Sequence, residues 1–333
     1  MQSKQYQQIT FLYRLNSTKK RNSIKNQLKI KKMRTIYLSL LLTLCTVGVK
    51  AQLLWKITGN GLTKPSYMIG TYHLAPVSFT DSIQGLKQVM EESEQVYGEV
   101  ITDEMTKPEN VLMMQAAMML PEGKTLSQLF NNDEMTSINN MMKELMGTDM
   151  TNPIVAQQLD RMTPQALQMQ LTILMYLKNN PGFNPLETFD GYFQKEAKSK
   201  GKPVGGLETI EFQTNLLYKS TSLERQSEQL LCLANNKAAY EKMADALTKA
   251  FFSQDIKAIK EAVDMKLNNS CDGTEEEDDR LIYSRNANWA ELIPGIMKDK
   301  STLFVVGAAH LIGEKGMINL LRNKGYNIEG IGN

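Results

Sequence analysis

Two distant segments of this 333-residue chain share one local pattern: an apolar run, a glycine, two residues and a histidine. Residues 67–74 read YMIGTYHL and residues 304–311 read FVVGAAHL, and they contain the chain's only two histidines, His73 and His310. An apolar run that closes on glycine before a polar residue is typical of the carboxyl end of a buried central strand. Ligands of open α/β sheets bind at these ends. We therefore expect two neighbouring strands that present both imidazoles to one point.

Strand and helix patterns alternate along the rest of the chain. Strands are expected at residues 53–58, 66–70, 95–100, 203–208, 302–307 and 326–331. Helices are expected from about residue 81, with Ile83, Leu86, Val89 and Met90 on one face, and at about 209–233, 237–253, 255–267, 280–297 and 315–323. This alternation predicts an α/β fold in which helices flank a central, mostly parallel sheet.

Residues 104–200 form a large Met-rich helical insertion in this prediction. Thirteen of the 21 methionines lie between residues 105 and 175. Methionine fills irregular cores, and it also lines adaptable surfaces that bind peptides. The sequence leaves both interpretations open: a packed helical subdomain, or an apolar groove for a peptide or lipid-like ligand.

The charge of the chain is unevenly distributed. Residues 1–51 contain eleven of the 38 Lys and Arg residues and no acidic residue, which leaves 27 basic and 36 acidic residues in the rest. Residues 52–333 therefore carry a formal net charge of −9, and we expect no affinity for nucleic acid or for anionic lipid.

The basic leader precedes an apolar run of 14 residues, 36–49, that predicts a signal peptide at about residues 33–51. The run is short for a membrane span, and small residues at Val49 and Ala51 place cleavage before Gln52. Residues 1–32 then form an over-extended basic leader ahead of a start at Met33. An uncleaved anchor, or a lipoprotein attached through Cys45, are the alternatives. The mature domain, residues 52–333, is expected in the periplasm or outside the cell, with no stable membrane span after cleavage.

Two cysteines remain in the mature domain, Cys232 and Cys271. In an exported protein such a pair is most simply a disulfide. It would close a loop of about 40 residues and stabilise the fold by about 3–4 kcal/mol through loop entropy.

Carboxylates follow two of the predicted strands, and this position makes them candidates for chemistry. Glu99 follows residues 96–98, and Glu208 follows residues 204–207. Two histidines and one carboxylate, with water in the open position, form a catalytic metal site. The other carboxylate would be the general base. Arg285, on a predicted helix, is a candidate for stabilising an oxyanion.

Several of these motifs together resemble TraB/GumN-type proteins, the group that contains the Tiki metalloproteases. The resemblance spans residues 53–331 and is carried by the motifs LWKI (54–57), GNG (59–61), PSY (65–67), GTYHL (70–74), GLET (206–209) with Gln213, RN (285–286) and GAAHL (307–311). It implies a hydrolase-like fold, related to that of erythromycin-esterase-like proteins, in which the two motif histidines and a glutamate are essential. His73, Glu99 and His310 fall on those positions, and Glu208 and Arg285 fall on further family positions.

The sequence therefore predicts an exported, divalent-metal-dependent hydrolase, most simply a peptidase acting on a peptide or protein. His73, His310 and one glutamate would hold Mn²⁺, Co²⁺ or Zn²⁺, and Glu99 or Glu208 would deprotonate the bound water. The alternative is a non-catalytic protein that sequesters a peptide or haem, because imidazoles also bind haem iron.

Overall fold

The computed structural model describes residues 52–180, 183–184 and 187–332. The predicted signal peptide and basic leader, residues 1–51, lie outside the described residues. The strands are β1 (Leu54–Gly59), β2 (Ser66–Thr71), β3 (Gln95–Gly98), β4 (Val204–Gly206), β5 (Thr302–Gly307) and β6 (Tyr326–Gly330). The α-helices are α2 (Leu86–Glu92), α3 (Pro108–Ala117), α4 (Leu126–Leu129), α5 (Asn132–Met146), α6 (Pro153–Leu159), α7 (Pro164–Asn179), α8 (Phe189–Ser199), α9 (Ile210–Lys219), α10 (Leu223–Asn235), α11 (Lys237–Phe252), α12 (Ile256–Val263), α13 (Glu275–Asp278), α14 (Ser284–Ile296) and α15 (Met317–Asn323).

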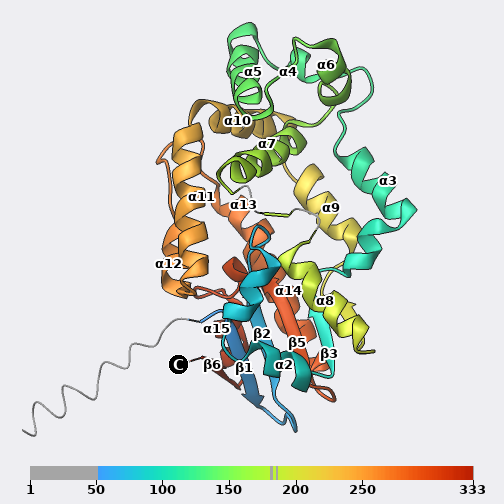
Figure 1. Cartoon of the computed structure of the whole chain (residues 1–333), viewed down its shortest axis with the longest axis vertical. Coiled ribbons are helices and arrows are strands. Elements are labelled where there is room, and N and C mark those ends of the chain that lie inside the picture. Colours follow the sequence, from blue (N-terminus) through green and yellow to red (C-terminus); the bar gives the residue numbers. More distant parts are fainter. Residues whose placement is uncertain (1–51, 181–182, 185–186, 333) are drawn as a thin grey trace, which may run out of the picture. The chain divides into compact units, whose positions relative to one another are not determined.

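The six strands form one sheet in the order β4-β3-β5-β2-β1-β6 (Figure 1). Strands β4, β3, β5 and β2 run parallel, whereas β1 pairs antiparallel with both β2 and β6. The expected α/β class with a mostly parallel sheet is confirmed. The strands of both histidine motifs, β2 and β5, are parallel neighbours, with Gly70 opposite Val306. Their carboxyl ends therefore lie at the same edge of the sheet.

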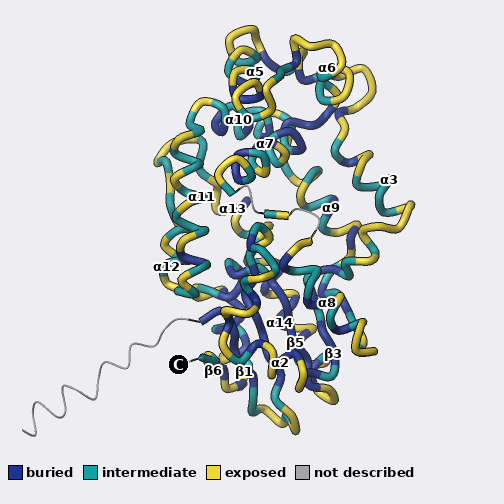
Figure 2. The backbone as a smooth tube through the Cα atoms, in the orientation of Figure 1, coloured by how far each residue is buried: buried dark blue, intermediate teal, exposed yellow. Residues whose placement is uncertain are grey.

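Helices cover both faces of the sheet because its central strands are apolar on both sides. Along β5, Leu303 and Val305 pack in the cluster that contains Phe189 and Phe193 of α8. Phe304, between them, packs in the cluster of Trp289 and Ile293 of α14 and Leu321 of α15. Successive side chains of a strand point to opposite faces, and Figure 2 shows the resulting buried strands.

A third core, with no strand in it, holds the methionine-rich helices together. Met141 and Met142 of α5, Met175 of α7 and Leu230 of α10 are buried in it. Methionine side chains therefore fill the space between helices here, as the first of the two interpretations expects. Met105 is an exception, because 43% of its surface is exposed.

Several element boundaries differ from the sequence predictions. The helix expected from about residue 81 begins at Leu86, because Gly85 precedes it with φ of +79° and residues Val77–Ser82 form a 3₁₀ turn instead. The helix expected at 209–233 is two helices, α9 and α10, and Ser222 caps the second by accepting from the backbone N–H of Arg225. Local turn geometry overrides the helical pattern at both places.

The predicted disulfide between Cys232 and Cys271 is present, with a Cα–Cα distance of 5.5 Å. It ties α10 to the loop that precedes α13. Among the described residues, none of the helices combines the length and the apolar character that a membrane span requires.

A charged contact reinforces the same junction. The guanidinium of Arg225 on α10 donates to both carboxylate oxygens of Glu277 on α13, at 3.0 and 3.1 Å. It also donates to the carbonyl oxygens of Ser270 and Asp272, on either side of Cys271. The hydrogen bonds from Arg225 hold the pKa of Glu277 below its ordinary value.

Replacing Glu277 with glutamine should lower the free energy of unfolding by about 1.5–3 kcal/mol at pH 7, because charged hydrogen bonds are lost. The folded state has the lower pKa, so this stabilisation is present above about pH 4.5, the ordinary value, and is lost as the pH falls further. Urea unfolding at pH 7 and pH 3 measures both. Glu276→Gln, at an 82% exposed side chain on the same helix, should change little at either pH. An equal loss at both pH values would contradict the prediction.

Candidate active site

The carboxyl ends of the parallel strands bring the predicted site residues together. His73 lies two residues beyond β2, Glu99 directly follows β3, and His310 lies in the 3₁₀ turn Ala308–His310 after β5. These three and Arg285 of α14 line one cavity of about 330 Å³, which we call the site cavity. Glu208, after β4, does not line this cavity but forms an ion pair with Arg285.

The motif glycines leave room for this arrangement. A Cβ atom on Gly70 would lie 2.7 Å from Cδ1 of Leu311 and 3.1 Å from Cα of Ala308, in and beside the turn that carries His310. Gly307 instead donates its backbone N–H to Oε1 of Glu99 at 2.9 Å. The first glycine thus admits the neighbouring turn, and the second binds the carboxylate.

Arg285 is the centre of the charged network. It is 7% exposed, and its guanidinium makes a bidentate ion pair with Glu208, with both distances 2.9 Å. The Nη2 atom also donates to Oε2 of Glu99 at 2.6 Å, and Nη1 donates to the carbonyl of Leu281 at 2.9 Å. Leu281 belongs to a π-helical turn, Asp279–Tyr283, and such turns recur at functional sites.

The two glutamates differ in how many donors they accept. Both oxygens of Glu208 are filled, because Trp289 Nε1 and Gln213 Nε2 add to the two bonds from Arg285. Glu99 accepts three hydrogen bonds, of which only the one from Gly307 reaches Oε1. A carboxylate accepts about four, so Oε1 of Glu99 keeps a position for a further donor such as water.

The charge of Glu99 is fixed by its neighbours. Burial alone would raise its pKa, but the electrostatic contributions of His310, Arg285 and His73 outweigh burial, and the pKa lies below its ordinary value. Of these three neighbours, Arg285 and His73 are charged at neutral pH. Glu99 is therefore a carboxylate at neutral pH.

His310 is neutral and its tautomer follows from its neighbours. Asn286 donates through Nδ2 to the carbonyls of His310 and Lys315, so its Oδ1 accepts from Nδ1–H of His310, at 2.7 Å. The Nε2 atom then carries the lone pair and accepts from Nη1 of Arg285 at 3.0 Å. Burial lowers the pKa of His310 to about 4.

His73 has the opposite environment. Its side chain is 71% exposed, and Nδ1 lies 2.7 Å from Oδ2 of Asp190, in the first turn of α8. The other oxygen of Asp190 accepts from Oγ1 of Thr71. The negative charge of Asp190 and its hydrogen bond raise the pKa of His73 to about 9. His73 is thus a cation at neutral pH, although it shares its motif with neutral His310.

From the sequence, Asp190 is not identified at all. Asn286 and Gln213 are named there as motif residues, but neither of them is assigned a contact in the site. Asp190 reaches His73 across 117 positions and only through the packing of α8 on the sheet. The only local feature that could indicate its role is a charged residue next to an apolar helix face, which Phe189 and Phe193 form.

Three of the four predicted metal donors, His73, Glu99 and His310, border the site cavity, but their arrangement does not fit a cation. Arg285 donates to Nε2 of His310 and to Oε2 of Glu99, so His310 offers a metal no free lone pair while Arg285 is in place. Within residues 52–180, 183–184 and 187–332, no cluster of three or more His, Cys, Asp or Glu side chains has the geometry to hold a metal ion. A cation would fit only after Arg285 moved away.

The fold and the site together define a class: α/β proteins with a polar site at the carboxyl ends of their parallel strands. The sequence profile of the TraB/PrgY/gumN family matches residues 53–330, and the chain belongs to this family.

Three curated relatives show how distant the similarity is. The chain is 24% identical over 306 residues to metalloprotease TIKI2 of Xenopus tropicalis, covering 80% of the chain and 57% of that protein. It is 22% identical to metalloprotease TIKI2 of Danio rerio and to metalloprotease TIKI1 of Homo sapiens, covering 83% of the chain in both cases and 60% and 61% of those proteins. The chain thus spans about three fifths of the length of these relatives. No solved structure matches it.

Replacing Gly70 with alanine should lower the free energy of unfolding by about 1–3 kcal/mol, because the new Cβ displaces Leu311 and Ala308. Urea unfolding measures the loss, and the ¹⁵N signals of the His310 ring should shift with the turn. Gly295→Ala in α14 is the matched control, since no atom lies within 4 Å of its Cβ position. The control should be neutral or more stable. Equal stability of Gly70→Ala and the wild type would contradict this explanation of the motif.

Proposed function

We propose that the chain is a hydrolase that cleaves peptide bonds in the site cavity. The observation that carries this proposal is the pairing of a free carboxylate position, Oε1 of Glu99, with an accessible imidazolium, His73, at one cavity that Arg285 also borders. Acid and base functions separate when the environment shifts two titratable groups in opposite directions. The names of the relatives, metalloproteases, add support for a protein substrate.

Each residue has a distinct part in this proposal. Glu99 holds a water molecule and takes its proton as the oxygen attacks the carbonyl carbon. All five N–H groups of Arg285 already donate within the network, so Arg285 stabilises the oxyanion that forms through its positive charge rather than through a hydrogen bond. As the carbon–nitrogen bond breaks, His73 gives its Nε2 proton to the leaving amine, and the proton on Glu99 restores it. Glu208 and His310 hold Arg285 in place.

We propose in addition that the mature domain is exported to the periplasm or the cell exterior. The predicted signal peptide is the sequence argument. The disulfide between Cys232 and Cys271 supports it, because disulfides persist in oxidising compartments.

His73→Gln and Glu99→Gln should each lower kcat/KM for casein or a quenched peptide library by about 10²–10⁴-fold, because each removes one proton transfer. Glu99→Gln keeps the shape of the side chain, His73→Gln keeps a polar side chain in place of the ring, and circular dichroism verifies folding. Glu291→Gln, at a 75% exposed side chain, is the control and should retain full activity. Full activity in either site variant rejects the assigned roles. Tight peptide or haem binding without hydrolysis by the wild type would favour the non-catalytic alternative.

The metal predicted from the sequence, Mn²⁺, Co²⁺ or Zn²⁺ on His73, His310 and Glu99 or Glu208, remains a separate prediction. If Arg285 excludes the cation, Arg285→Gln should bind Co²⁺ at least about tenfold more tightly than the wild type, because it frees Nε2 of His310 and an oxygen of Glu99. Absorption of the cobalt complex measures binding. Arg285→Gln combined with His310→Gln should lose the gain. Tight, stoichiometric Co²⁺ binding by the wild type that depends on both histidines would contradict the exclusion and support the metallohydrolase.

A further inference from the structure

The site cavity shares lining residues with two further cavities. On one side it shares His73 and Glu99 with a cavity of about 250 Å³, which we call the β3 cavity. On the other side it shares Val263, Ile282 and Ala309 with a cavity of about 130 Å³, which we call the α12 cavity. The proposed acid and base therefore lie where two of three neighbouring cavities meet, and we call the three cavities together the groove.

Apolar side chains line the groove on both sides of His73 and Glu99. In the site cavity these are Leu247, Phe251, Ile259, Val263 and Leu281, and in the β3 cavity they are Val100, Met105 and Val305. Val263, Leu281 and Met105 are 45%, 38% and 43% exposed. Covering these exposed apolar surfaces with an apolar ligand is favourable.

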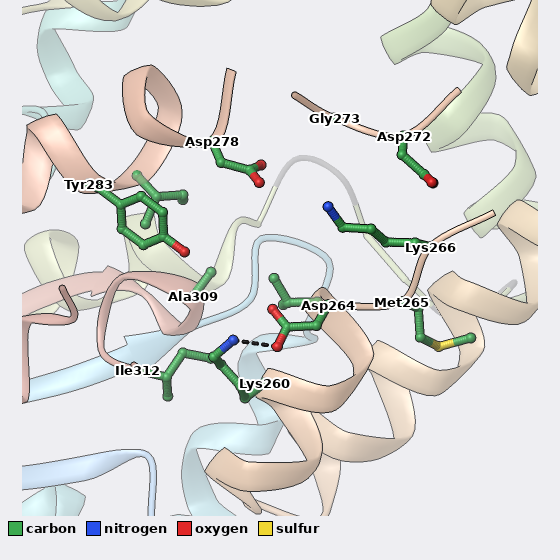
Figure 3. Close-up of a pocket in the computed structure, with 12 residues that line it drawn as sticks. Lys260, Asp264, Met265, Lys266, Asp272, Gly273, Asp278, Tyr283, Ala309 and Ile312 are labelled. Atoms are coloured by element: carbon green, nitrogen blue, oxygen red, sulfur yellow. Dashed lines mark hydrogen bonds and ion pairs between the residues drawn. The ribbon is translucent and has the colours of Figure 1, made fainter. Parts of the chain in front are cut away.

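The α12 cavity has different chemistry. Lys260, Asp264, Lys266 and Asp278 line it, and Lys260 pairs with Asp264 (Figure 3). Figure 3 shows the amine of Lys266 and the carboxylate of Asp278 directed into this cavity. Charges of both signs line this end of the groove, so the end accommodates polar groups without selecting one charge.

We propose that the groove binds an extended polypeptide that has one apolar side chain on each side of the cleaved bond. The bound polypeptide extends beyond the cleaved bond in both directions. The substrate is therefore cut at an internal bond rather than at a terminus. In an extended segment successive side chains point to opposite faces, so the two side chains that flank the bond enter different cavities, the site cavity and the β3 cavity. This substrate class rests on the proposed hydrolytic function.

The test uses dodecapeptides blocked by acetyl and amide groups at their ends. The wild type should cleave a central Leu–Phe bond with kcat/KM about 10–200-fold above that for central Lys–Phe, Leu–Lys or Ser–Gly bonds. Rates within twofold of one another, or cleavage only of peptides with a free terminus, would overturn the proposal.

Variants test the two sides separately. Met105→Asp should reduce discrimination against lysine on one side of the bond, and Val263→Asp should reduce it on the other side. Leu292→Asp is the matched control, because Leu292 is 49% exposed and lines none of the three cavities. Identical selectivity changes in all three variants, or none in Met105→Asp and Val263→Asp, would overturn the assignment.

A binding measurement separates this inference from the proposed function. The chain has two histidines, so ¹⁵N-histidine labelling gives signals from two imidazoles, which His73→Gln assigns. The wild type could cleave no peptide and still show a shift of the His73 signals when the Leu–Phe peptide is added. If this shift is weaker in Met105→Asp and Val263→Asp, the result supports peptide binding in the groove and rejects the hydrolase. Cleavage without preference among central pairs retains the hydrolase and rejects the groove. If the wild type shows no cleavage and no shift of the His73 signals, both the hydrolase and the groove are rejected.

Discussion

The ion pairs of Arg285 are the interaction on which the site depends. A buried charge is costly unless partners surround it, and this guanidinium takes its partners from three separate segments: Glu99 after β3, Glu208 after β4 and His310 after β5. Displacing any one segment would leave a charge or a donor unpaired. The network therefore adds to the two backbone hydrogen bonds that join the ends of β3 and β4, from Leu207 N–H to the Gly98 carbonyl and from Glu208 N–H to the Glu99 carbonyl, and it extends the connection to the end of β5.

The two histidine motifs share one sequence pattern, but their imidazoles have different charges at neutral pH. Both motifs place their histidine shortly after the end of a central strand, yet the partners of the two histidines come from different helices. Asp190 on α8 makes His73 a cation, whereas Asn286 on α14 and burial keep His310 neutral. Imidazole chemistry is thus set by the helix that covers each strand end rather than by the motif itself.

How much of this could be predicted from the sequence depends on whether the signal is local. Unbroken apolar runs place β2 and β5 at the centre of the sheet, and the glycine in each run indicates which residues leave its end, so the meeting of His73 and His310 at one cavity follows from their sequence context. Asp190 carries no such signal, because its position depends on how Phe189 and Phe193 pack α8 against the sheet. The predicted start of α2 is also wrong. The helical spacing of apolar residues begins before Gly85, at Ile83, whereas the helix itself begins at Leu86.

Electrostatics also bears on how a metal ion, which the names of the metalloprotease relatives suggest, would relate to this arrangement. A divalent ion between Glu99 and His310 would meet a guanidinium already 2.6 and 3.0 Å from those side chains. Two cations sharing one carboxylate repel strongly in a buried site. Arg285 and a metal are therefore competing solutions to the same requirement, positive charge beside Glu99. The relatives named metalloproteases are 22–24% identical to the chain, and under our proposal the position of the Arg285 side chain on α14 decides whether a guanidinium or a metal ion lies beside Glu99.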